Sequence, residues 1–369
     1  VLSNNSGTSK INGATSITTD KVAFDVYDYT AGGYTAPEVN VNTTGIIDGK
    51  IEVSESISNN LNISGGLFTA QIAEAWCADG YIPTTEVVDG TTYYTVKVGE
   101  YVAQIGDKKY EKFADAIAAV NNAETITLLK DNAESVTIKQ VAGKSFTIDG
   151  AGKTYKGTIT VDGNKRSTGA ETLTIKNVNF LAEGQWQSSI FAVKSTFVHN
   201  VTIDGCTFTG NDAKQAYGIR LHHSYNIVVK NIIGEDLYDL VYANTAVTGF
   251  TAENVTVTES GMGFMMPYGK NLSFKNVTLN VEGAGVGIYN YNASTATFEN
   301  CNFTAYPPVH LEQKNTTNAY SLTFNGTNTF AGSDKWLKVI GTDAKFTVTL
   351  NDPSLDVHKT SGLIAGVGN

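Results

Sequence analysis

The sequence predicts an all-β protein in which short strands stack coil upon coil into a solenoid. The first observation is a nine-residue unit whose sixth position is Asn or Gly and which returns at steps of 22 to 28 residues. The second is that apolar and polar residues alternate within each copy, the period of a half-buried strand. The copies read NLSFKNVTL (271–279), TLTIKNVNF (172–180), NVTIDGCTF (200–208), NIVVKNIIG (226–234), GFTAENVTV (249–257) and TATFENCNF (295–303), with weaker ones beginning at Lys144 and Ser321.

Two columns of apolar residues are expected to face the core on either side of this Asn or Gly. The residue between them sits at a sharp bend, where Asn and Gly tolerate left-handed backbone. A single coil of this length cannot bury its apolar side alone, whereas stacked copies form one continuous core. The first column is Ile148, Ile175, Ile203, Val229, Ala252, Phe274, Phe298 and Phe324, and the second is Val178, Cys206, Ile232, Val255, Val277 and Cys301.

From about Tyr110 to the end, the chain resembles the right-handed parallel β-helix of the pectate-lyase-like superfamily. Five residues at the bend resemble the asparagine ladder of that family: Asn177, Asn231, Asn254, Asn276 and Asn300. We expect their amides to hydrogen-bond along the axis in one line, stacked inside the chain. The resemblance implies a fold and leaves the function open.

Residues 1–100 form a β-rich segment, expected to be extra coils or a small separate β module. After a polar lead-in of twenty residues, short strands are predicted at Val22–Tyr29, 39–42, Gly45–Val53, Asn60–Phe68 and Thr91–Lys97. The run ISGGLF…AEAWCADGYIPT…GTTYYTV is similar to non-catalytic repeat modules of long cell-surface proteins of gut bacteria. That similarity implies that residues 1–100 end one module and that residues 101–369 form the next.

A hairpin and a helix are expected to precede the solenoid. Tyr101–Ile105 and Lys109–Tyr110 flank a Gly-Asp turn, and Glu111–Val120 carries apolar residues at helical spacing. The helix followed by the strand Thr125–Leu129 resembles the N-terminal cap of pectate-lyase-like chains, which would cover the open first coil. Ser361–Asn369 shows no capping helix, and the start Val-Leu-Ser shows no leader, so we expect a trimmed piece of a longer protein.

Charge and composition exclude several functions. The formal net charge is −10, with 36 acidic against 26 basic residues, and Arg166 and Arg220 are the two arginines. This balance argues against binding nucleic acid or an anionic membrane surface. No apolar run is long enough for membrane insertion.

The three cysteines predict no disulfide framework. Cys206 and Cys301 share one inward column four coils apart. At one strand spacing per coil this is about 19 Å, far beyond disulfide reach. Both are expected to be buried free thiols.

A third strand in each coil is expected to present a ligand-binding strip. Its copies are Gly218–His222, Leu240–Asn244, Gly263–Pro267, Gly287–Tyr291 and Val309–Gln313. With Ile219, Val241, Phe264, Ile288 and Val309 inward, alternation turns Arg220, His222, Tyr242, Asn244, Met265, Pro267, Tyr289, Tyr291, His310 and Glu312 outward. Tyrosine faces at even spacing suit stacking on sugar rings, although β-sheet surfaces also favour tyrosine for cross-strand packing. Trp186 is a further stacking candidate, or a lid over a coil edge.

The same region offers an enzymatic alternative. Glu235, Asp236 and Asp239 precede the strip close to Arg220 and His222, and paired carboxylates suit acid–base work on a glycosidic bond or calcium binding. Lyases of the family use a basic residue beside acidic calcium ligands, and its hydrolases use a trio of aspartates with Gly-His-Gly and Arg-Ile-Lys. Neither pattern is present. Adjacent residues such as His222 and His223 face opposite sides of a strand, so they form no metal motif.

The sequence therefore favours a secreted or cell-surface, non-catalytic β-helix, adhesin-like or glycan-binding, with a carbohydrate or host-surface glycan as partner and no cofactor or metal. The alternatives are a polysaccharide lyase or glycoside hydrolase of the same fold and a purely structural spacer.

Overall fold

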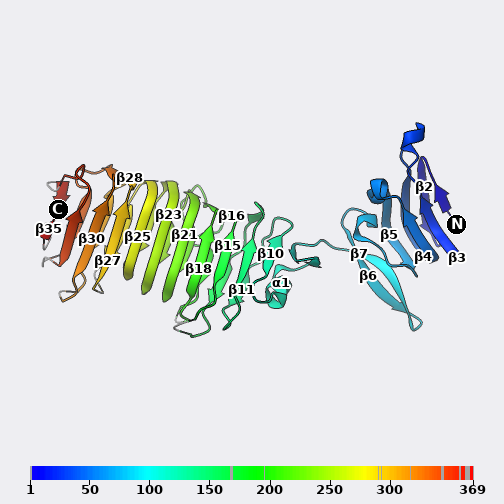
Figure 1. Ribbon diagram of the computed structural model, residues 1–369, viewed down its shortest axis with the longest axis horizontal. Helices are drawn as coiled ribbons and strands as arrows, with labels where there is room; N and C mark the ends of the chain where they lie inside the picture. Colours follow the sequence, from blue (N-terminus) through cyan, green and yellow to red (C-terminus); the bar gives the residue numbers. More distant parts are fainter. Residues whose placement is uncertain are drawn as a thin grey trace. The chain divides into compact units, whose positions relative to one another are not determined.

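The computed structural model describes residues 2–166, 169–194, 196–289, 291, 293–315, 317–341, 345–356, 359–361 and 366–368. The chain divides into two compact units, Val1–Tyr101 and Val102–Asn369, called unit 1 and unit 2 below (Figure 1).

Unit 1 is a small β structure with its own core. Its first five strands are joined by four parallel pairings, as stacked coils are, and an antiparallel hairpin follows. Alternating residues such as Leu61 and Ile63 are fully buried in this core. Its strands are β1 (Leu2–Asn4), β2 (Thr8–Gly13), β3 (Ile17–Val26), β4 (Glu38–Val53), β5 (Leu61–Phe68), β6 (Tyr81–Val88) and β7 (Thr91–Val98), with single 3-10 turns η1 (Thr30–Gly32), η2 (Glu55–Asn60) and η3 (Glu74–Trp76).

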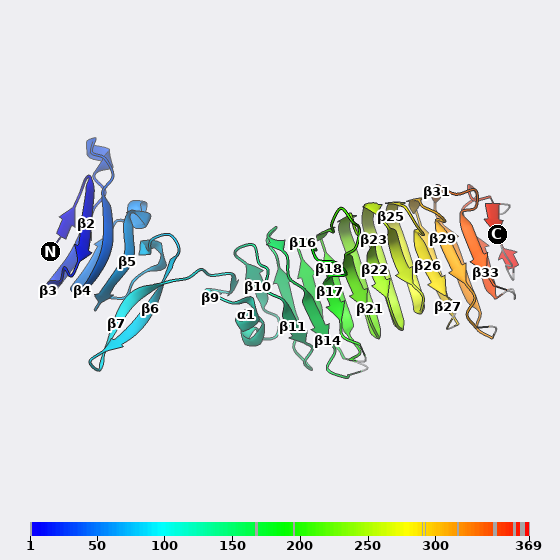
Figure 2. The ribbon, with the colours of Figure 1, turned by 180° about the vertical axis from the view of Figure 1, so that it is seen from behind.

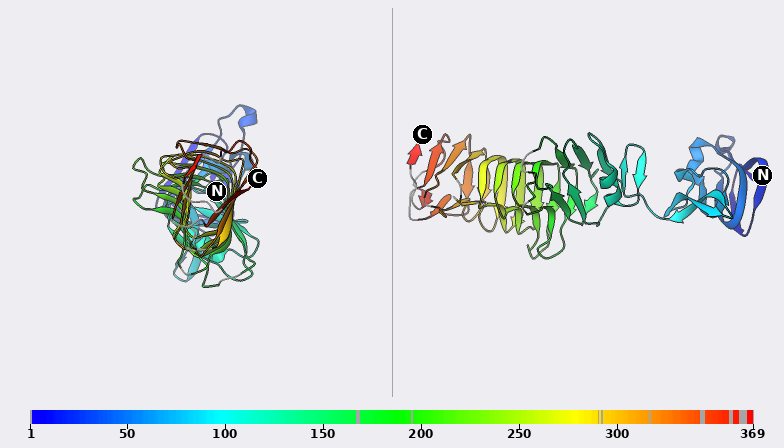
Figure 3. Two further views of the ribbon diagram at one scale, coloured as in Figure 1. Left: turned by 90° about the vertical axis from the view of Figure 1, so that its left-hand side faces the viewer. Right: turned by 90° about the horizontal axis from the view of Figure 1, so that it is seen from below.

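Unit 2 is a parallel β-solenoid, which confirms the predicted fold class. Strands of successive coils lie side by side along its length (Figure 3), and they form two sheets. The long sheet, facing the viewer in Figure 1, holds the first and second strands of each coil. Its parallel strands are β10 (Thr125–Leu128), β12 (Phe146–Asp149), β13 (Thr154–Tyr155), β15 (Leu173–Lys176), β16 (Asn179–Leu181), β18 (His199–Asp204), β19 (Thr207–Thr209), β21 (Ser224–Glu235), β23 (Val247–Ser260), β25 (Gly269–Val281), β27 (Ser294–Glu299), β28 (Asn302–Thr304), β30 (Tyr320–Asn325), β31 (Thr329–Ala331), β33 (Phe346–Leu350) and β35 (Gly366–Gly368).

The third-strand sheet lies on the opposite side, where Figure 2 shows several of its strands next to each other. Five of its strands match the predicted third strands to within two residues at each end. The sheet consists of β11 (Val136–Lys139), β14 (Ile159–Asp162), β17 (Ser188–Ala192), β20 (Tyr217–Leu221), β22 (Asp239–Ala243), β24 (Met262–Met266), β26 (Val286–Tyr289), β29 (Val309–Glu312), β32 (Leu337–Ile340) and β34 (Thr360–Ser361).

Both predicted core columns are confirmed. Every member of the first column pairs directly with the next, and the members of both columns are at most 1% exposed. Phe274, Phe298 and Phe324 stack face to face at centroid distances of 5.1 and 4.8 Å. Such aromatic pairs add to the free energy gained from burial alone.

The bend residues have the expected backbone, but the ladder is not interior. Asn177, Asn231, Asn254, Asn276 and Asn300 all have φ between 52° and 55°. Asn254 Nδ2 donates to Asn231 Oδ1 at 3.1 Å, and Asn276 Nδ2 donates to Asn254 Oδ1 at 3.0 Å. All five residues are exposed, so the prediction that they stack inside the chain is wrong. A left-handed residue directs its side chain away from the two flanking inward columns.

A second polar column occupies the other end of the same strands. Asn200, Asn226, Gly249 and Asn271 all have φ between 50° and 73°, and Asn226 Nδ2 donates to Asn200 Oδ1 at 3.0 Å. These residues are the first positions of four of the nine-residue copies. The same Asn-or-Gly signal at that position was therefore available in the sequence.

At the start of the solenoid, β8 (Ala103–Ile105) and β9 (Lys108–Tyr110) form the predicted hairpin, and β8 pairs antiparallel with β10. Helix α1 (Phe113–Ala119) is shorter than the predicted Glu111–Val120. It buries Phe113 completely, and the backbone N–H of Phe113 donates to Glu134 at 2.9 Å. That this end acts as a cap stays a prediction. Of the C-terminal stretch Ser361–Asn369, residues 362–365 and 369 lie outside the described part.

The cysteines are free, as predicted. Cys206 and Cys301 are each 1% exposed, and Cys77 in unit 1 is half-buried. Burial raises the pKa of Cys206 to about 12 and that of Cys301 to about 11. Both thiols therefore stay protonated at neutral pH and react slowly.

Candidate functional site

The outer face of the third-strand sheet carries the candidate site. One row of paired residues crosses it from coil to coil, running Phe191, Arg220, Tyr242, Met265, Gly287, His310 and Lys338. The inward residues Ile219, Val241, Phe264, Ile288 and Val309 are fully buried, as expected. Phe264 pairs with Val286 rather than with Ile288, so Tyr289 lies one row further along, opposite Glu312.

Four aromatic rings form a cluster over the first coils of this face. The Trp186 ring lies 6.0 Å from Tyr217 and 5.3 Å from Tyr238, and Tyr217 lies 5.4 Å from Tyr242. Trp186 is 48% exposed and has a left-handed backbone, with φ of 59°. Its N–H donates to the carbonyl of Gln215, which ties its loop to the neighbouring coil. The cluster presents one exposed ring beside three half-buried tyrosines.

Asp239 is fully buried among these rings. It occupies the same row as Tyr217, and neither of its carboxylate oxygens has a hydrogen-bond partner among the described residues. Burial alone raises the pKa of Asp239 to about 7. Its carboxylate in turn contributes, after burial, to raising the pKa of Tyr217 to about 12. An unpartnered buried carboxyl group costs free energy, so it calls for an explanation beyond stability.

Arg220 is held between aromatic rings. Its guanidinium carbon lies 5.4 Å from the Tyr217 centroid and 5.8 Å from that of Tyr242, within cation–π range. Its Nε is buried without a partner among the described residues.

His222 was predicted on the outer strip, but it is covered and only 4% exposed. The Phe191 ring packs against it at 5.5 Å, and its Nδ1 also lacks a partner among the described residues. Burial, followed by the positive charge of Arg220, lowers the pKa of His222 to about 4.

The three predicted carboxylates are not brought together. Glu235 ends β21 in the long sheet and is exposed, Asp236 lies at the bend, and Asp239 begins β22 in the third-strand sheet. The raised pKa of Asp239 has burial as its cause, without a contribution from Glu235 or Asp236. The arrangement therefore does not form the paired carboxylates that the enzymatic alternative requires.

A second aromatic group continues the strip. Tyr268 and Tyr291 stack at 4.3 Å, and Tyr289 lies 6.4 Å from Tyr291. Tyr242 is among the groups that raise the pKa of Tyr268 and Tyr289, after larger effects from Tyr291 and from burial respectively. Tyr242 pairs with Met265 and Met265 with Gly287, two residues before Tyr289, so the two aromatic groups lie on one face and two strand spacings apart.

Polar groups border the second aromatic group. Glu312 pairs with Lys314, whose ammonium lies 5.2 Å above the Tyr289 ring. His310 Nε2 is buried without a partner in the described part of the chain, and burial lowers the pKa of His310. Asn244 is half-buried at the end of its strand. These groups offer donors and acceptors beside the tyrosine faces.

Within the described ranges, no three His, Cys, Asp or Glu residues are grouped in a way that could hold a metal ion. In that part of the chain, no helix is both long and apolar enough to cross a membrane. The chain matches no protein-family model, and a search of curated proteins finds no match to its sequence.

Proposed function

We propose that the outer face of the third-strand sheet binds a neutral polysaccharide and that the protein is a non-catalytic, adhesin-like module. The observation that carries this proposal is the coincidence of aromatic rings with unpartnered polar atoms. Asp239, Arg220 and His222 keep buried hydrogen-bonding atoms unpaired beneath and beside the rings of Trp186, Tyr217 and Tyr242. Ligand sites typically combine aromatic walls with a few polar groups of this kind.

A carbohydrate suits this face because a sugar ring offers both an apolar face and hydroxyl groups. The tyrosine and tryptophan rings supply stacking surfaces, and Asn244, His310 and Glu312 lie at their border. From β17 to β29 the face covers five strand spacings, or about 24 Å. This length favours an extended chain over a single sugar.

A neutral ligand suits the charges better than an anionic one. The strip holds Arg220, whose guanidinium is enclosed by rings, while Lys314 is already paired with Glu312. Asp239 and Glu312 would repel an anionic sugar. Binding is therefore expected to change little with salt, since no exposed charge pairing is involved.

The enzymatic alternative has one observation in its favour, the pKa of Asp239 near 7, which suits a general acid. Against it, Glu235 belongs to the other sheet and makes no contribution to the raised pKa of Asp239, so the two do not form a carboxylate pair. Binding a polysaccharide without cleaving it is the simpler function for these residues, because it requires no paired carboxylates. A spacer without a ligand would leave the unpartnered atoms of the face without a role.

The proposal includes a secreted or cell-surface location and, through the resemblance of its coils, membership of the pectate-lyase-like superfamily among surface modules of gut bacteria. The asparagine ladder and the stacked core columns support the superfamily. The acidic balance supports a soluble, exposed module.

The test is a glycan array with the full chain, followed by titration of any neutral oligosaccharide that binds. We expect Tyr289→Ala with Tyr291→Ala to abolish this binding while leaving the melting temperature nearly unchanged, because Tyr291 is 37% exposed and Tyr289 is half-buried. Ile233→Ala, a change at a 56% exposed residue of the long sheet, is the control and should bind normally. Unaltered affinity in the tyrosine variant would exclude the second aromatic group, and loss only in Trp186→Ala would move the site to the first. Release of shorter sugars from a bound glycan would instead establish the enzyme.

A further inference from the structure

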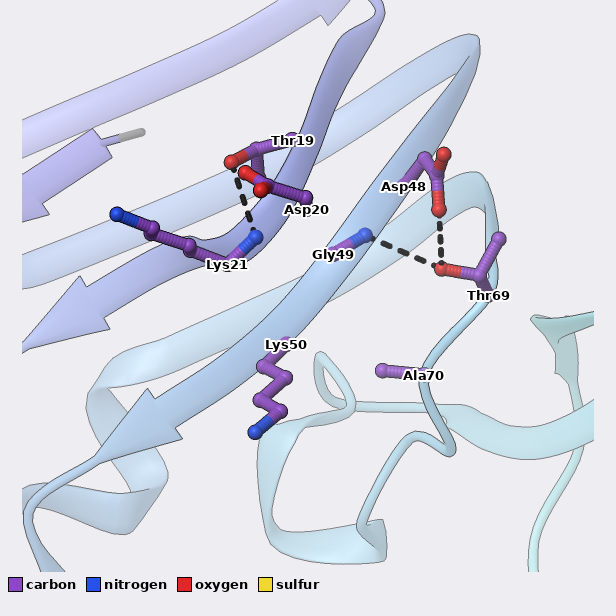
Figure 4. A pocket seen from close by; sticks show the side chains of 8 residues that line it. All are labelled: Thr19, Asp20, Lys21, Asp48, Gly49, Lys50, Thr69 and Ala70. Atoms are coloured by element: carbon purple, nitrogen blue, oxygen red, sulfur yellow. Dashed lines mark hydrogen bonds between the residues drawn. The ribbon is translucent and has the colours of Figure 1, made fainter.

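Unit 1 carries two hollows of different character. One lies between β3, β4 and the turn after β5, lined by Thr19, Asp20, Lys21, Asp48, Gly49, Lys50, Thr69 and Ala70 (Figure 4). Thr69 Oγ1 donates to Asp48 at 3.0 Å and accepts from the N–H of Gly49, while the charged side chains of Asp20, Lys21 and Lys50 belong to exposed residues. It has no aromatic surface and no buried unpaired group, so nothing in it selects a ligand.

The other hollow is built on tyrosines. Tyr27, Tyr29 and Tyr34 are 53%, 49% and 62% exposed. The Tyr29 ring lies 5.1 Å from Tyr27 and 6.5 Å from Tyr34. Three adjacent large rings with about half of their surface in water are unusual in a unit that buries Phe24 and Phe68 completely. We call these three residues the tyrosine patch.

A hydrogen-bonded turn fixes the tyrosine patch. In η1, the N–H of Gly32 donates to Tyr29 O and that of Gly33 donates to Thr30 O, both at 2.9 Å. Gly33 has φ of 84°, which a residue with a side chain rarely adopts. A side chain at Gly32 would meet the Tyr34 ring at 3.3 Å. The backbone that carries the rings is therefore fixed before any ligand arrives, which lowers the entropy cost of binding.

Uncommitted polar groups border the rings. The hollow has a volume of about 320 Å³ and is lined by Asn5, Ser6, Tyr29 and Tyr34. The Asn5 amide and the three tyrosine hydroxyls have no hydrogen-bond partner among the described residues. Asp28, next in sequence to two of the tyrosines, accepts from Ser56 and Thr30. These bonds, that from Ser56 foremost, lower the pKa of Asp28, so an anionic ligand would be repelled.

We propose that the tyrosine patch of unit 1 is a second binding site, for a neutral carbohydrate. The Tyr29 and Tyr34 rings are nearly perpendicular, at 85°, so a sugar ring would stack its apolar face on one of them and contact the other from the side. Its hydroxyls would both donate to and accept from the Asn5 amide. A proline-rich peptide is the competing ligand for exposed tyrosines. It offers mainly carbonyl acceptors and would leave the acceptor oxygen of Asn5 unused.

The site stands on its own residues and does not depend on the strip in unit 2. Each unit would hold one site on a rigid β framework. Two sites on one chain raise the avidity for a polysaccharide that displays many copies of its repeat.

The experiment compares three full-length variants on one array of neutral oligosaccharides and by titration with each oligosaccharide bound. They are Tyr29→Ala with Tyr34→Ala, Tyr289→Ala with Tyr291→Ala, and the control Tyr306→Ala, which alters a 61% exposed tyrosine outside both sites. We expect the first variant to bind at least one oligosaccharide about ten-fold more weakly than the natural chain. Its melting temperature should stay unchanged, and the control should bind normally.

The outcomes separate the two proposals. Loss only in the unit 1 variant supports the tyrosine patch and excludes the second aromatic group of the strip. Loss only in the unit 2 variant supports the strip and overturns the tyrosine patch. Binding of a proline decamer that disappears in the unit 1 variant, without any effect on oligosaccharides, also overturns the carbohydrate assignment.

Discussion

The two outer faces of the solenoid are made from the same coils but treat their polar groups in opposite ways. On the long sheet, polar side chains of successive coils form hydrogen bonds and ion pairs with one another along the axis. Asn231, Asn254 and Asn276 form a hydrogen-bonded chain, and Lys230 pairs with Asp204 at 3.2 Å. On the third-strand sheet, Asp239, Arg220, His222 and His310 each keep a buried atom unpaired. The stacking of the coils accounts for the paired polar groups of the long sheet, but it does not account for the unpaired buried atoms of the third-strand sheet.

Two buried carboxylates show the same contrast within one unit. Glu171 is 3% exposed and contacts His199 Nε2 at 2.8 Å and the guanidinium of Arg166. Burial alone would raise the pKa of Glu171, but hydrogen bonds from its own N–H and from His199, with the charge of Arg166, hold it below the ordinary value. Asp239 is equally buried and has none of these partners, so its pKa rises to about 7. The partners of Glu171 offset the effect of burial on its pKa, whereas Asp239 has no partner among the described residues to offset it.

The largest expected effect is the loss of stability caused by a substitution in the core, compared with a substitution on the outer strip. Phe274→Ala should cost about 3–5 kcal/mol of unfolding free energy, because the ring is fully buried and stacks on Phe298. Tyr289→Ala should cost much less, since its ring lies on the outer face. Urea titration of both variants is the measurement. Equal losses would mean that the inner and outer faces are assigned the wrong way round.

The next effect is the pH dependence of stability that the unpartnered carboxyl group of Asp239 causes. The pKa of Asp239 is raised from 3.8 to about 7 on folding, so between these values the folded state binds more protons than the unfolded state. Stability contributed by this group is therefore lost as pH rises from about 4 to about 7 and is constant above. The loss is at most about 4 kcal/mol.

His222 has the opposite sign, because its pKa is lowered on folding from 6.5 to about 4 and its stability contribution is lost as pH falls through that range. The informative quantity is therefore the difference between Asp239→Asn and the natural chain. We expect the Asp239→Asn variant to be the more stable at pH 8, with the advantage vanishing near pH 4, in urea titrations across this range.

Glu171→Gln should instead lower the unfolding free energy at pH 8 by about 2 kcal/mol, since it weakens a charge-assisted network. A difference for Asp239→Asn that does not change with pH would show that Asp239 has a partner in solution.

The smallest effect concerns the ladder. Asn254→Gly keeps the left-handed backbone and removes two side-chain hydrogen bonds, so it should cost about 1 kcal/mol. Asn254→Ala should cost about 1 kcal/mol more, because alanine is strained at this φ. Both variants should bind any glycan like the natural chain, as the ladder lies on the other sheet. Weakened binding would contradict the separation of the two faces.

Much of the fold could be read from local pattern. The steps of 22 to 28 residues, the alternation and the Asn or Gly between apolar columns predicted which residues are buried and which bend. These features are local, since a residue in a repeating coil pairs with its own counterpart one coil away. The second column at Asn200, Asn226 and Asn271 is equally local, because Asn at the first position of the unit marks a bend in the same way as Asn at the sixth.

The repeat predicted which third-strand residues face outward, such as Tyr242, but the contacts within the candidate site were decided by the tertiary structure. Strand alternation predicted that His222 points outward, but alternation does not predict that the Phe191 ring packs over this side chain. Closeness in sequence suggested that Glu235 and Asp239 act together, but the bend between them sends one to each sheet. Whether a buried polar atom has a hydrogen-bond partner depends on which residue of the neighbouring coil lies opposite it. For Glu171 it is His199, and for Asp239 the paired residues are Tyr217 on one side and Met262 on the other.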